Sequence, residues 1–288
     1  MQIETPNDKT CIVCGETLSP SPRYPGLLHC PNCSFLTADL GIGCEDIFAL
    51  YGHDYFHGSE YGNYLEEQAA LEVNFARRLS EIRALPHLDD KSRLFEIGCA
   101  YGFFLRLAQA HFAEVAGIDV AEAAVNHARD VLKLDVRCGD VLIEKIPPSP
   151  DVVCMWDVIE HLERPDLVIG EVAEALAPGG YVCITTGDVG SWVARFRGPK
   201  WRMIHPPTHL HYFDRTTLSR LLANHGLEVV STTYPPVVRT LGTLLHGIFK
   251  LRLGADNLYR FLAKVPGQRL PIPINLFDIM SMTARKPG

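Results

Sequence analysis

Short apolar runs alternate with helical patterns between residues 93 and 187, and this alternation constrains the fold more than any other feature. The helical patterns include residues 103–112 and 164–177. The apolar runs are residues 94–97, 115–118, 134–137, 152–156 and 181–186. Strands that alternate with helices build a parallel sheet with crossover helices. The sequence therefore predicts an α/β fold.

A glycine-containing turn follows the first predicted strand. Gly98 and Gly102 allow a sharp turn and a close approach to a ligand, and the helix that starts after them favours an anionic group. A dinucleotide fingerprint would have glycine where Ala100 and Phe103 stand, so that reading is not favoured. Glu96 is expected to hold the loop or to accept a hydrogen bond from a ligand's ammonium group.

Acidic residues also stand at the ends of the next strands. Asp119 lies 21 residues after Gly98, where a carboxylate can bind the two hydroxyls of a ribose. Asp140 follows the third run and could accept from an adenine amino group, with Val141 packed on the ring face. The fourth run leads directly into Asp157. These positions predict a nucleoside site along one edge of the sheet.

Five segments in this order resemble the class I S-adenosylmethionine-dependent methyltransferases, over about residues 90–286. They are 96–102, 117–119, 139–141, 157–162 and 176–180. The resemblance implies a Rossmann-like, doubly wound seven-stranded sheet with an antiparallel last strand. It also implies that Gly98 to Gly102 face the methionine moiety, Asp119 the ribose, Asp140 the adenine and Asp157 the edge of the transfer site. The predicted cofactor-binding residues are Glu96, Gly98, Cys99, Ala100, Tyr101, Gly102, Asp119, Val120, Asp140, Val141, Asp157, Val158 and Tyr61.

Two C-x2-C pairs, Cys11 with Cys14 and Cys30 with Cys33, are separated by fifteen residues near the N-terminus. This spacing is typical of a structural zinc site with four thiolates. We expect a zinc ribbon over residues 1–45, whose folding depends on the metal. A redox pair or four unrelated core cysteines are the alternatives. The remaining cysteines are expected to be buried small residues: Cys44, Cys99, Cys138, Cys154 and Cys183.

Residues 46–88 form the second predicted unit. The stretch 51–64 is rich in aromatic residues and reads either as a lid over a ligand or as packing against the next domain. A helical pattern follows over 65–85. The third unit, 89–288, is the predicted methyltransferase domain.

Two basic segments occur in the last third of the chain. Residues 191–212 contain four cationic side chains and three histidines and no acidic residue, which suggests an anionic acceptor, although a solvated loop is the simpler reading. An insertion at about 235–275 separates the predicted sixth and seventh strands, 227–232 and 276–283. Its amphipathic run 241–251 could contact a membrane surface, form a homodimer face or cover the pocket.

Methyl transfer to a hydroxyl or an enolisable carbon needs a base, and a histidine near its ordinary pKa suits that task. His161, at the end of the fourth strand, is the first candidate. The others are His205, His209, His211 and Tyr212. For each of them, packing without a catalytic role is the alternative.

Composition narrows the function. The chain has 27 basic and 34 acidic residues and a net charge of -7, which makes nucleic acid an unlikely main partner. No apolar stretch suits a membrane span and no secretory signal is evident, so a cytoplasmic location is expected.

We predict a methyltransferase similar to those that act on sugars and other small molecules. The acceptor would be an anionic sugar nucleotide, glycan precursor or related metabolite. A zinc-ribbon ribosomal RNA methyltransferase and a non-catalytic cofactor-binding protein are the alternatives.

Overall fold

A computed structural model describes most of the chain. The described residues are 10–40, 67–246, 249, 254–262, 267–268 and 270–288. The predicted lid at 51–64, with Tyr61, lies outside them, as does Cys44.

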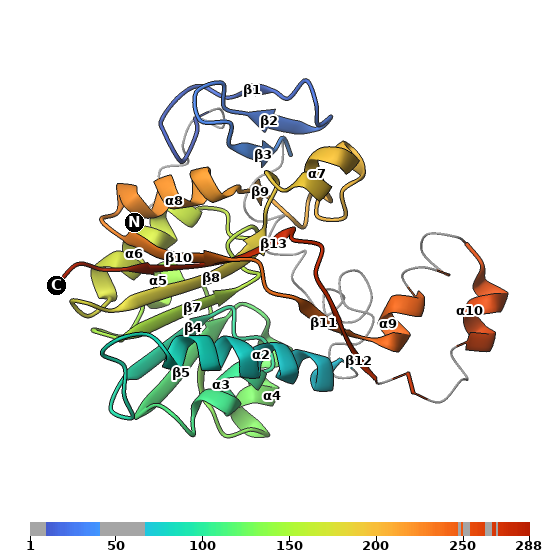
Figure 1. The fold of residues 1–288 in the computed structure, drawn as a ribbon. Coiled ribbons are helices and arrows are strands. Elements are labelled where there is room, and N and C mark those ends of the chain that lie inside the picture. The colour runs from blue at the N-terminus through green and yellow to red at the C-terminus, as the bar shows by residue number, and fades with distance from the viewer. Residues whose placement is uncertain (1–9, 41–66, 247–248, 250–253, 263–266, 269) are drawn as a thin grey trace.

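A seven-stranded sheet forms the centre of the molecule, in the order β10-β13-β8-β7-β4-β5-β6 (Figure 1). Strands β4 to β8 run parallel, and β13 is antiparallel to both of its neighbours. The strands are β4 (Arg93–Ile97), β5 (Glu114–Asp119), β6 (Asp135–Cys138), β7 (Val152–Trp156), β8 (Tyr181–Gly187), β10 (Glu228–Thr233) and β13 (Ile279–Arg285). The predicted fold class is confirmed.

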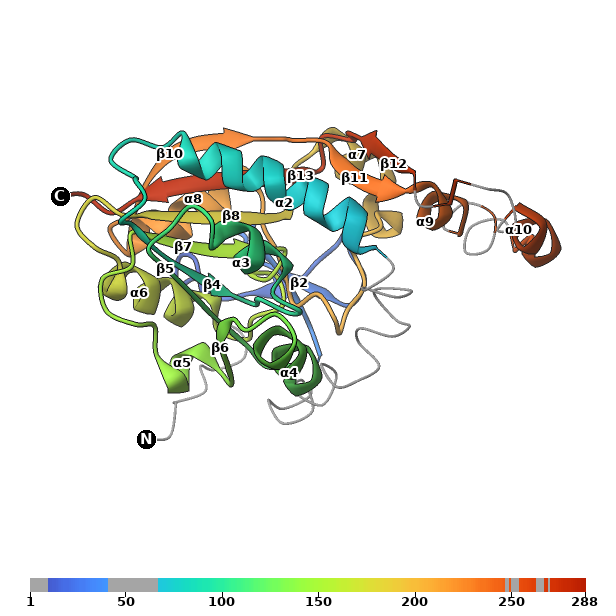
Figure 2. The same cartoon turned by 90° about the horizontal axis from the view of Figure 1, so that it is seen from below.

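Helices cover both faces of this sheet, and each face has its own apolar core. One face packs against α2 (Gln68–Arg83), α3 (Phe103–Ala108) and α4 (Glu122–Asp130), and the other against α5 (Val141–Glu144), α6 (Pro165–Ala175) and α8 (Arg215–Asn224) (Figures 1 and 2). Every residue of β7 and β8 is buried, as expected of parallel strands covered on both sides.

The last strand starts three residues later than the sequence predicts. Phe277 has a positive φ of 54°, and the Asn275 side chain accepts a hydrogen bond of 2.8 Å from its backbone nitrogen. This local turn keeps the apolar residues Leu276 and Phe277 out of the strand, and both are exposed. The pattern of apolar residues could not distinguish them from the strand that follows.

The N-terminal module joins the methyltransferase domain through a shared sheet. Strands β1 (Ser19–Pro20), β2 (Leu27–His29) and β3 (Leu36–Ala38) pair in order, and β3 also pairs with β9 (His211–Tyr212). The module lies above α8 in Figure 1, next to α7 (Trp192–Arg197) and the 3-10 turn Gly198–Lys200. One strand of the four therefore comes from a segment more than 170 residues away along the chain.

The insertion forms an arm that extends from the sheet (Figures 1 and 2). Its base is an antiparallel pair, β11 (Val237–Thr240) and β12 (Pro271–Ile274), and its described helices are α9 (Leu241–Leu245) and α10 (Asp256–Leu262). The buried Asn74 side chain bonds both the backbone nitrogen and the carbonyl of Val238, each at 2.9 Å, and so fixes the arm to α2. The described part of the predicted helix 241–251 is short. Among the described residues, no helix has the length and apolar character needed to cross a bilayer.

Candidate functional site

The loop after β4 has a backbone that requires glycine. Gly98 and Gly102 have φ values of 75° and 76°, and Ala100 between them has 44°. A Cβ on Gly98 would lie 2.4 Å from Cγ2 of Val158, and one on Gly102 would lie 2.4 Å from Cδ1 of Leu134. Both glycines therefore let neighbouring side chains pack directly against the loop.

Asp119 holds this loop in place from the end of β5. Its two carboxylate oxygens accept hydrogen bonds from the backbone nitrogens of Ala100, at 2.8 Å, and Ala121, at 2.9 Å. Burial raises the pKa of Asp119, and these hydrogen bonds oppose that shift. Each carboxylate oxygen can accept more than one hydrogen bond, so ribose binding stays compatible with this role.

Glu96 is buried beneath the same loop. Its side chain is 2% exposed, and Oε2 has no hydrogen-bond partner among the described residues. Burial, together with the nearby Asp119 charge, raises the pKa of Glu96 well above its ordinary value. A buried acceptor without a partner beside a glycine loop fits the ammonium group of S-adenosylmethionine.

Asp140 and Val141 are the residues predicted to contact adenine, and Val120 is a further predicted cofactor-binding residue. Oδ1 of Asp140 accepts a hydrogen bond of 2.8 Å from the backbone nitrogen of Leu142 and so caps α5, a role that the sequence did not predict. Val141 is buried in the core, whereas Val120 is 40% exposed. Val120 therefore offers the adenine ring a more accessible apolar surface than Val141 does.

The two other side chains of the glycine loop, those of Cys99 and Tyr101, are both buried.

Asp157 lies at the end of β7 in a strained backbone, with φ of 58°. Its nitrogen donates to Thr185, and Nη2 of Arg78 lies 3.0 Å from its Oδ2. Burial acts to raise the pKa of Asp157, but the Arg78 charge and hydrogen bond lower it below the ordinary value. The Arg78 guanidinium also lies 4.9 Å from the Trp156 ring centroid. The sequence does not point to Arg78, because nothing in the pattern of α2 marks one arginine as facing the sheet edge.

Three of the predicted histidines come together next to Asp157. The ring centroids of His161 and His209 are 4.6 Å apart, and those of His205 and His209 are 3.9 Å apart. Burial lowers the pKa of His161 to about 4 and that of His209 to about 2. Both imidazoles are therefore neutral at neutral pH.

Glu160 joins this group and was not among the predicted site residues. Its carboxylate oxygens make no hydrogen bond of ordinary geometry to a described residue, although Thr186 is close enough to affect its titration. Burial and the negative charge of Asp157 raise the pKa of Glu160 to about 8. The sequence shows Glu160 beside His161, but it does not show that His209 approaches them.

His211 and Tyr212 have contacts that favour packing over catalysis. Nδ1 of His211 is 3.1 Å from the Thr37 hydroxyl and Nε2 is 3.3 Å from the Glu163 carbonyl oxygen, while the Tyr212 hydroxyl donates to the His209 carbonyl at 2.9 Å. Burial lowers the pKa of His211 to about 4 and raises that of Tyr212. Both side chains help to join β9 to the N-terminal module.

The four N-terminal cysteines form one cluster. Their sulfur atoms all lie within 4.8 Å of one another, with Cys11 3.5 Å from Cys33 and Cys14 3.3 Å from Cys30. These distances are far longer than a disulfide bond, and the thiols are free. Of the other described cysteines, three are buried as predicted, but Cys138 is exposed, because it ends an edge strand where one face meets solvent.

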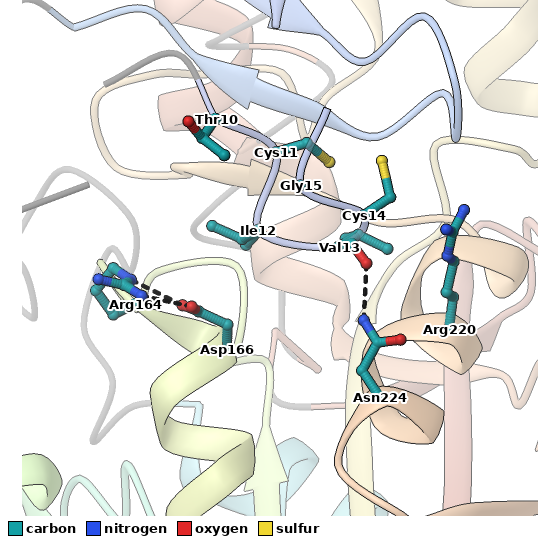
Figure 3. Close-up of a pocket in the computed structure, with 10 residues that line it drawn as sticks. All are labelled: Thr10, Cys11, Ile12, Val13, Cys14, Gly15, Arg164, Asp166, Arg220 and Asn224. Atoms are coloured by element: carbon teal, nitrogen blue, oxygen red, sulfur yellow. Dashed lines mark hydrogen bonds and ion pairs between the residues drawn. The ribbon is translucent and has the colours of Figure 1, made fainter. Parts of the chain in front are cut away.

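A cavity of about 380 Å³ lies where this module meets α6 and α8 (Figure 3). The Asn224 side chain donates to the Val13 carbonyl across it, at 2.7 Å. Its lining residues are Thr10, Cys11, Ile12, Val13, Cys14, Gly15, Arg164, Asp166, Arg220 and Asn224. None of them belongs to the glycine loop.

The predicted cationic segment is only partly available to a ligand. Arg195, Arg197 and Lys200 are exposed around α7. Arg202 instead pairs with the buried Asp278 at 3.0 Å, and Asp278 also accepts from Trp201 at 2.9 Å. Trp201 and Arg202 therefore have structural roles.

The sheet order, the glycine loop and the acidic strand ends define a class I S-adenosylmethionine-dependent methyltransferase. Residues 64–232, more than half of the chain, match the family described as methyltransferase domain. The chain belongs to this family.

Two curated relatives are similar to part of this chain. The biotin biosynthesis bifunctional protein BioHC of Cellvibrio japonicus is 30% identical over 183 residues, covering 60% of this chain and 35% of that protein. The ubiquinone biosynthesis O-methyltransferase of Burkholderia pseudomallei is 28% identical over 167 residues, covering 53% of this chain and 71% of that protein. The match to BioHC thus spans about a third of its length.

Two solved structures share the fold. YcgJ of Bacillus subtilis has a TM-score of 0.50 and 12% identity, covering 74% of this chain and 99% of its own. The [4+2]-cyclase SpnF has a TM-score of 0.50 and 23% identity, covering 73% and 80%. At these identities the comparison concerns the fold alone.

Proposed function

We propose that this methyltransferase acts on an oxygen atom of a small anionic molecule, such as a sugar nucleotide, a glycan precursor or a related metabolite. The observation that carries the proposal is the group of His161, His205 and His209, whose rings contact one another beyond the carboxyl end of β7 and which offers a base for a hydroxyl acceptor. The printed names of two relatives, in biotin and in ubiquinone biosynthesis, support a small acceptor, and one of them is an O-methyltransferase.

The residues at the strand ends would hold the cofactor. Glu96 would accept from its ammonium group, Asp119 would bind the ribose hydroxyls and Asp140 the adenine amino group, beside the Gly98–Gly102 loop. When bound, S-adenosylmethionine supplies an electrophilic methyl group. The protein then has to align the acceptor and exclude water. The buried walls formed by Trp156 and Arg78 suit the second task.

A base completes the proposed site. The lowered pKa values of His161 and His209 make each of them a weak base at neutral pH. His205 is partly exposed and its ring contacts that of His209. His205 is therefore our choice among the predicted histidines for the group that accepts the acceptor's proton.

The exposed cations around α7 support an anionic acceptor. Arg195, Arg197 and Lys200 follow β8, one of the strands whose carboxyl ends form the site. Ligands of doubly wound sheets bind at these ends. Positive charge here would attract a phosphate or carboxylate.

The four cysteines would bind Zn²⁺ in a structural role. Four thiolates within reach of one ion match tetrahedral zinc ligation. Since β3 pairs with β9, the metal would also stabilise the segment that carries His209.

One experiment tests the acceptor class. The protein is incubated with methyl-labelled S-adenosylmethionine and a panel of sugar nucleotides, phenols and RNA, and products are identified by mass spectrometry. We expect label on the oxygen of an anionic small molecule. Label on RNA, or on carbon, would contradict the proposal.

A further inference from the structure

Glu160, His161 and His209 form a second cluster of metal-ligating side chains, apart from the four cysteines. Each offers one ligand atom, and these atoms all lie within 4.8 Å of one another. Glu160 and His161 follow β7, whereas His209 precedes β9. The Glu160 carbonyl accepts from the backbone nitrogens of Leu210, at 2.8 Å, and His211, at 3.1 Å. Those two hydrogen bonds fix the segments side by side.

The Glu160 carboxyl group is the strongest indication of a ligand. It is 2% exposed, and both of its oxygens are buried without a hydrogen bond of ordinary geometry to a described residue. Burial of a carboxylate that has no full partner is unfavourable in proteins, and coordination to a cation offsets the lost solvation.

The two histidines have the tautomer that a metal ion needs. Nδ1 of His161 is 2.8 Å from the Thr208 carbonyl oxygen, and Nδ1 of His209 is 2.9 Å from the Met203 carbonyl oxygen. A carbonyl only accepts hydrogen bonds, so each Nδ1 carries the proton and each Nε2 carries the lone pair. A backbone carbonyl that orients the imidazole in this way is the usual outer partner of a metal-bound histidine.

His211 shows the contrast. Both of its ring nitrogens contact oxygen atoms of the protein, Nδ1 the Thr37 hydroxyl and Nε2 the Glu163 carbonyl. Its ring belongs to the joint between β3 and β9, and it is not part of the cluster. His211 is therefore held in that joint by contacts of its own.

We propose that Glu160, His161 and His209 bind one divalent first-row transition-metal ion. One carboxylate and two imidazoles favour Mn²⁺, Fe²⁺, Co²⁺ or Zn²⁺ over Mg²⁺ and Ca²⁺, which prefer oxygen ligands alone. Three protein ligands leave coordination positions open, and these could accept an oxygen of the acceptor. The proposal that the cluster binds a metal does not depend on the proposed function, whereas a role of the metal in binding the acceptor oxygen rests on it.

Manganese separates this cluster from the cysteine site, because thiolates select zinc. The full chain is first supplied with one equivalent of Zn²⁺. Mn²⁺ binding is then measured by equilibrium dialysis with metal analysis, and by electron paramagnetic resonance. We expect one Mn²⁺ per chain, and at least roughly tenfold weaker binding after Glu160→Gln or His209→Asn. The control His111→Gln, in the loop after α3, should bind Mn²⁺ as the unchanged protein does.

Two further measurements keep the outcome clear. S-adenosylhomocysteine titrated into each variant by calorimetry shows whether the fold and the cofactor site are intact. Mn²⁺ should raise the melting temperature of the unchanged protein but not that of His161→Asn. Absence of a stoichiometric Mn²⁺ site, or equal Mn²⁺ affinity in all the variants, would overturn the metal proposal. If the unchanged protein does not bind S-adenosylhomocysteine, that result would instead contradict the proposed function.

Discussion

At the scale of single residues, the site depends on two positions with opposite demands. Gly98 must lack a side chain, because Val158 occupies the space that a Cβ would need. Asp157 must keep its charge in a partly buried position, and Arg78 provides the opposite charge. The need for glycine at position 98 can be predicted from the sequence, whereas the pairing of Asp157 with Arg78 cannot.

Replacement of Gly98 by alanine should destabilise the protein by about 2 to 4 kcal/mol, from the left-handed backbone together with the contact to Val158. Gly226→Ala is a matched control, because its φ is 75° and nothing lies within 4 Å of the added Cβ. It should cost only about 1 to 2 kcal/mol. Urea unfolding measures both, and calorimetry with S-adenosylhomocysteine should show weakened binding for Gly98→Ala alone. If Val158→Ala does not recover part of the loss in Gly98→Ala, the contact is not the cause.

Replacement of Arg78 by methionine should reduce stability in a pH-dependent way. The folded pKa of Asp157 lies below its ordinary value, so the ion pair contributes above about pH 4 and is lost as the pH falls through the folded pKa. Because the Asp157 side chain is 36% exposed, the expected cost at pH 7 is only about 1 to 2 kcal/mol. Urea unfolding at pH 7 and pH 3 should show a smaller difference at the lower pH. An equal difference at both values would assign the effect to the Trp156 contact.

At the scale of elements, the N-terminal module and the histidine segment form one unit. The pairing of β3 with β9 includes the Thr37 hydroxyl, which donates to the Leu210 carbonyl at 3.1 Å, and the Ala38 nitrogen, which donates to the same oxygen at 2.8 Å. The module therefore positions His209 as well as covering part of α8. A folded N-terminal module should therefore be needed to keep the segment of His209 and β9 in place.

Cys14→Ser should uncouple these elements. With one thiolate lost, zinc affinity falls, and the module loses folding free energy that the metal supplies. Hydrogen exchange should become faster in residues 36–38 and 209–212 and stay slow in β7 and β8. Cys138→Ser, at an exposed cysteine outside the cluster, is the control. Protection that survives loss of zinc would mean that the module folds on apolar packing alone.

At the scale of the whole molecule, the arm is inserted in the chain between β10 and β13 and extends beyond the sheet that these strands belong to. The Asn275 side chain donates to the Tyr234 carbonyl at 2.7 Å, so the two ends of the insertion lie together. The exposed side chains of α10 include Leu258 and Phe261, which are 46% and 69% exposed. These two side chains on one helix are the candidate contact surface of the arm.

We expect the arm to mediate self-association. The double variant Leu258→Ser/Phe261→Ser should shift the protein from dimer to monomer in sedimentation velocity, with unchanged affinity for S-adenosylhomocysteine. Partition onto anionic vesicles is measured in parallel. Vesicle binding that the substitutions abolish, with no change in association state, would favour a membrane contact instead. Replacement of residues 236–274 by a short turn should abolish the same contact as the double variant, whether that contact is with a second copy of the chain or with a vesicle.

Local pattern by itself determined the α/β class, the parallel strands, the glycine loop and the cysteine set. Each of these depends on neighbours in sequence: strands on runs of apolar residues, the loop on glycine conformations, and the metal pattern on C-x2-C spacing. Asp119 could be predicted as well, because it ends the strand next to the loop. The late start of β13 could not, because an asparagine side chain turns the backbone there.

Only the tertiary structure decided which distant side chains meet. Arg78 reaches Asp157 across 79 positions, and His209 reaches Glu160 and His161 because the backbone nitrogens of Leu210 and His211 donate to the Glu160 carbonyl. Such contacts depend on how helices and strands pack, and the periodicity of one element does not encode the position of another. The sequence put His161 first and His205, His209, His211 and Tyr212 after it, with nothing to separate the roles of those four. Packing separated the two histidines that lie with Glu160 from the two residues that join β9 to β3.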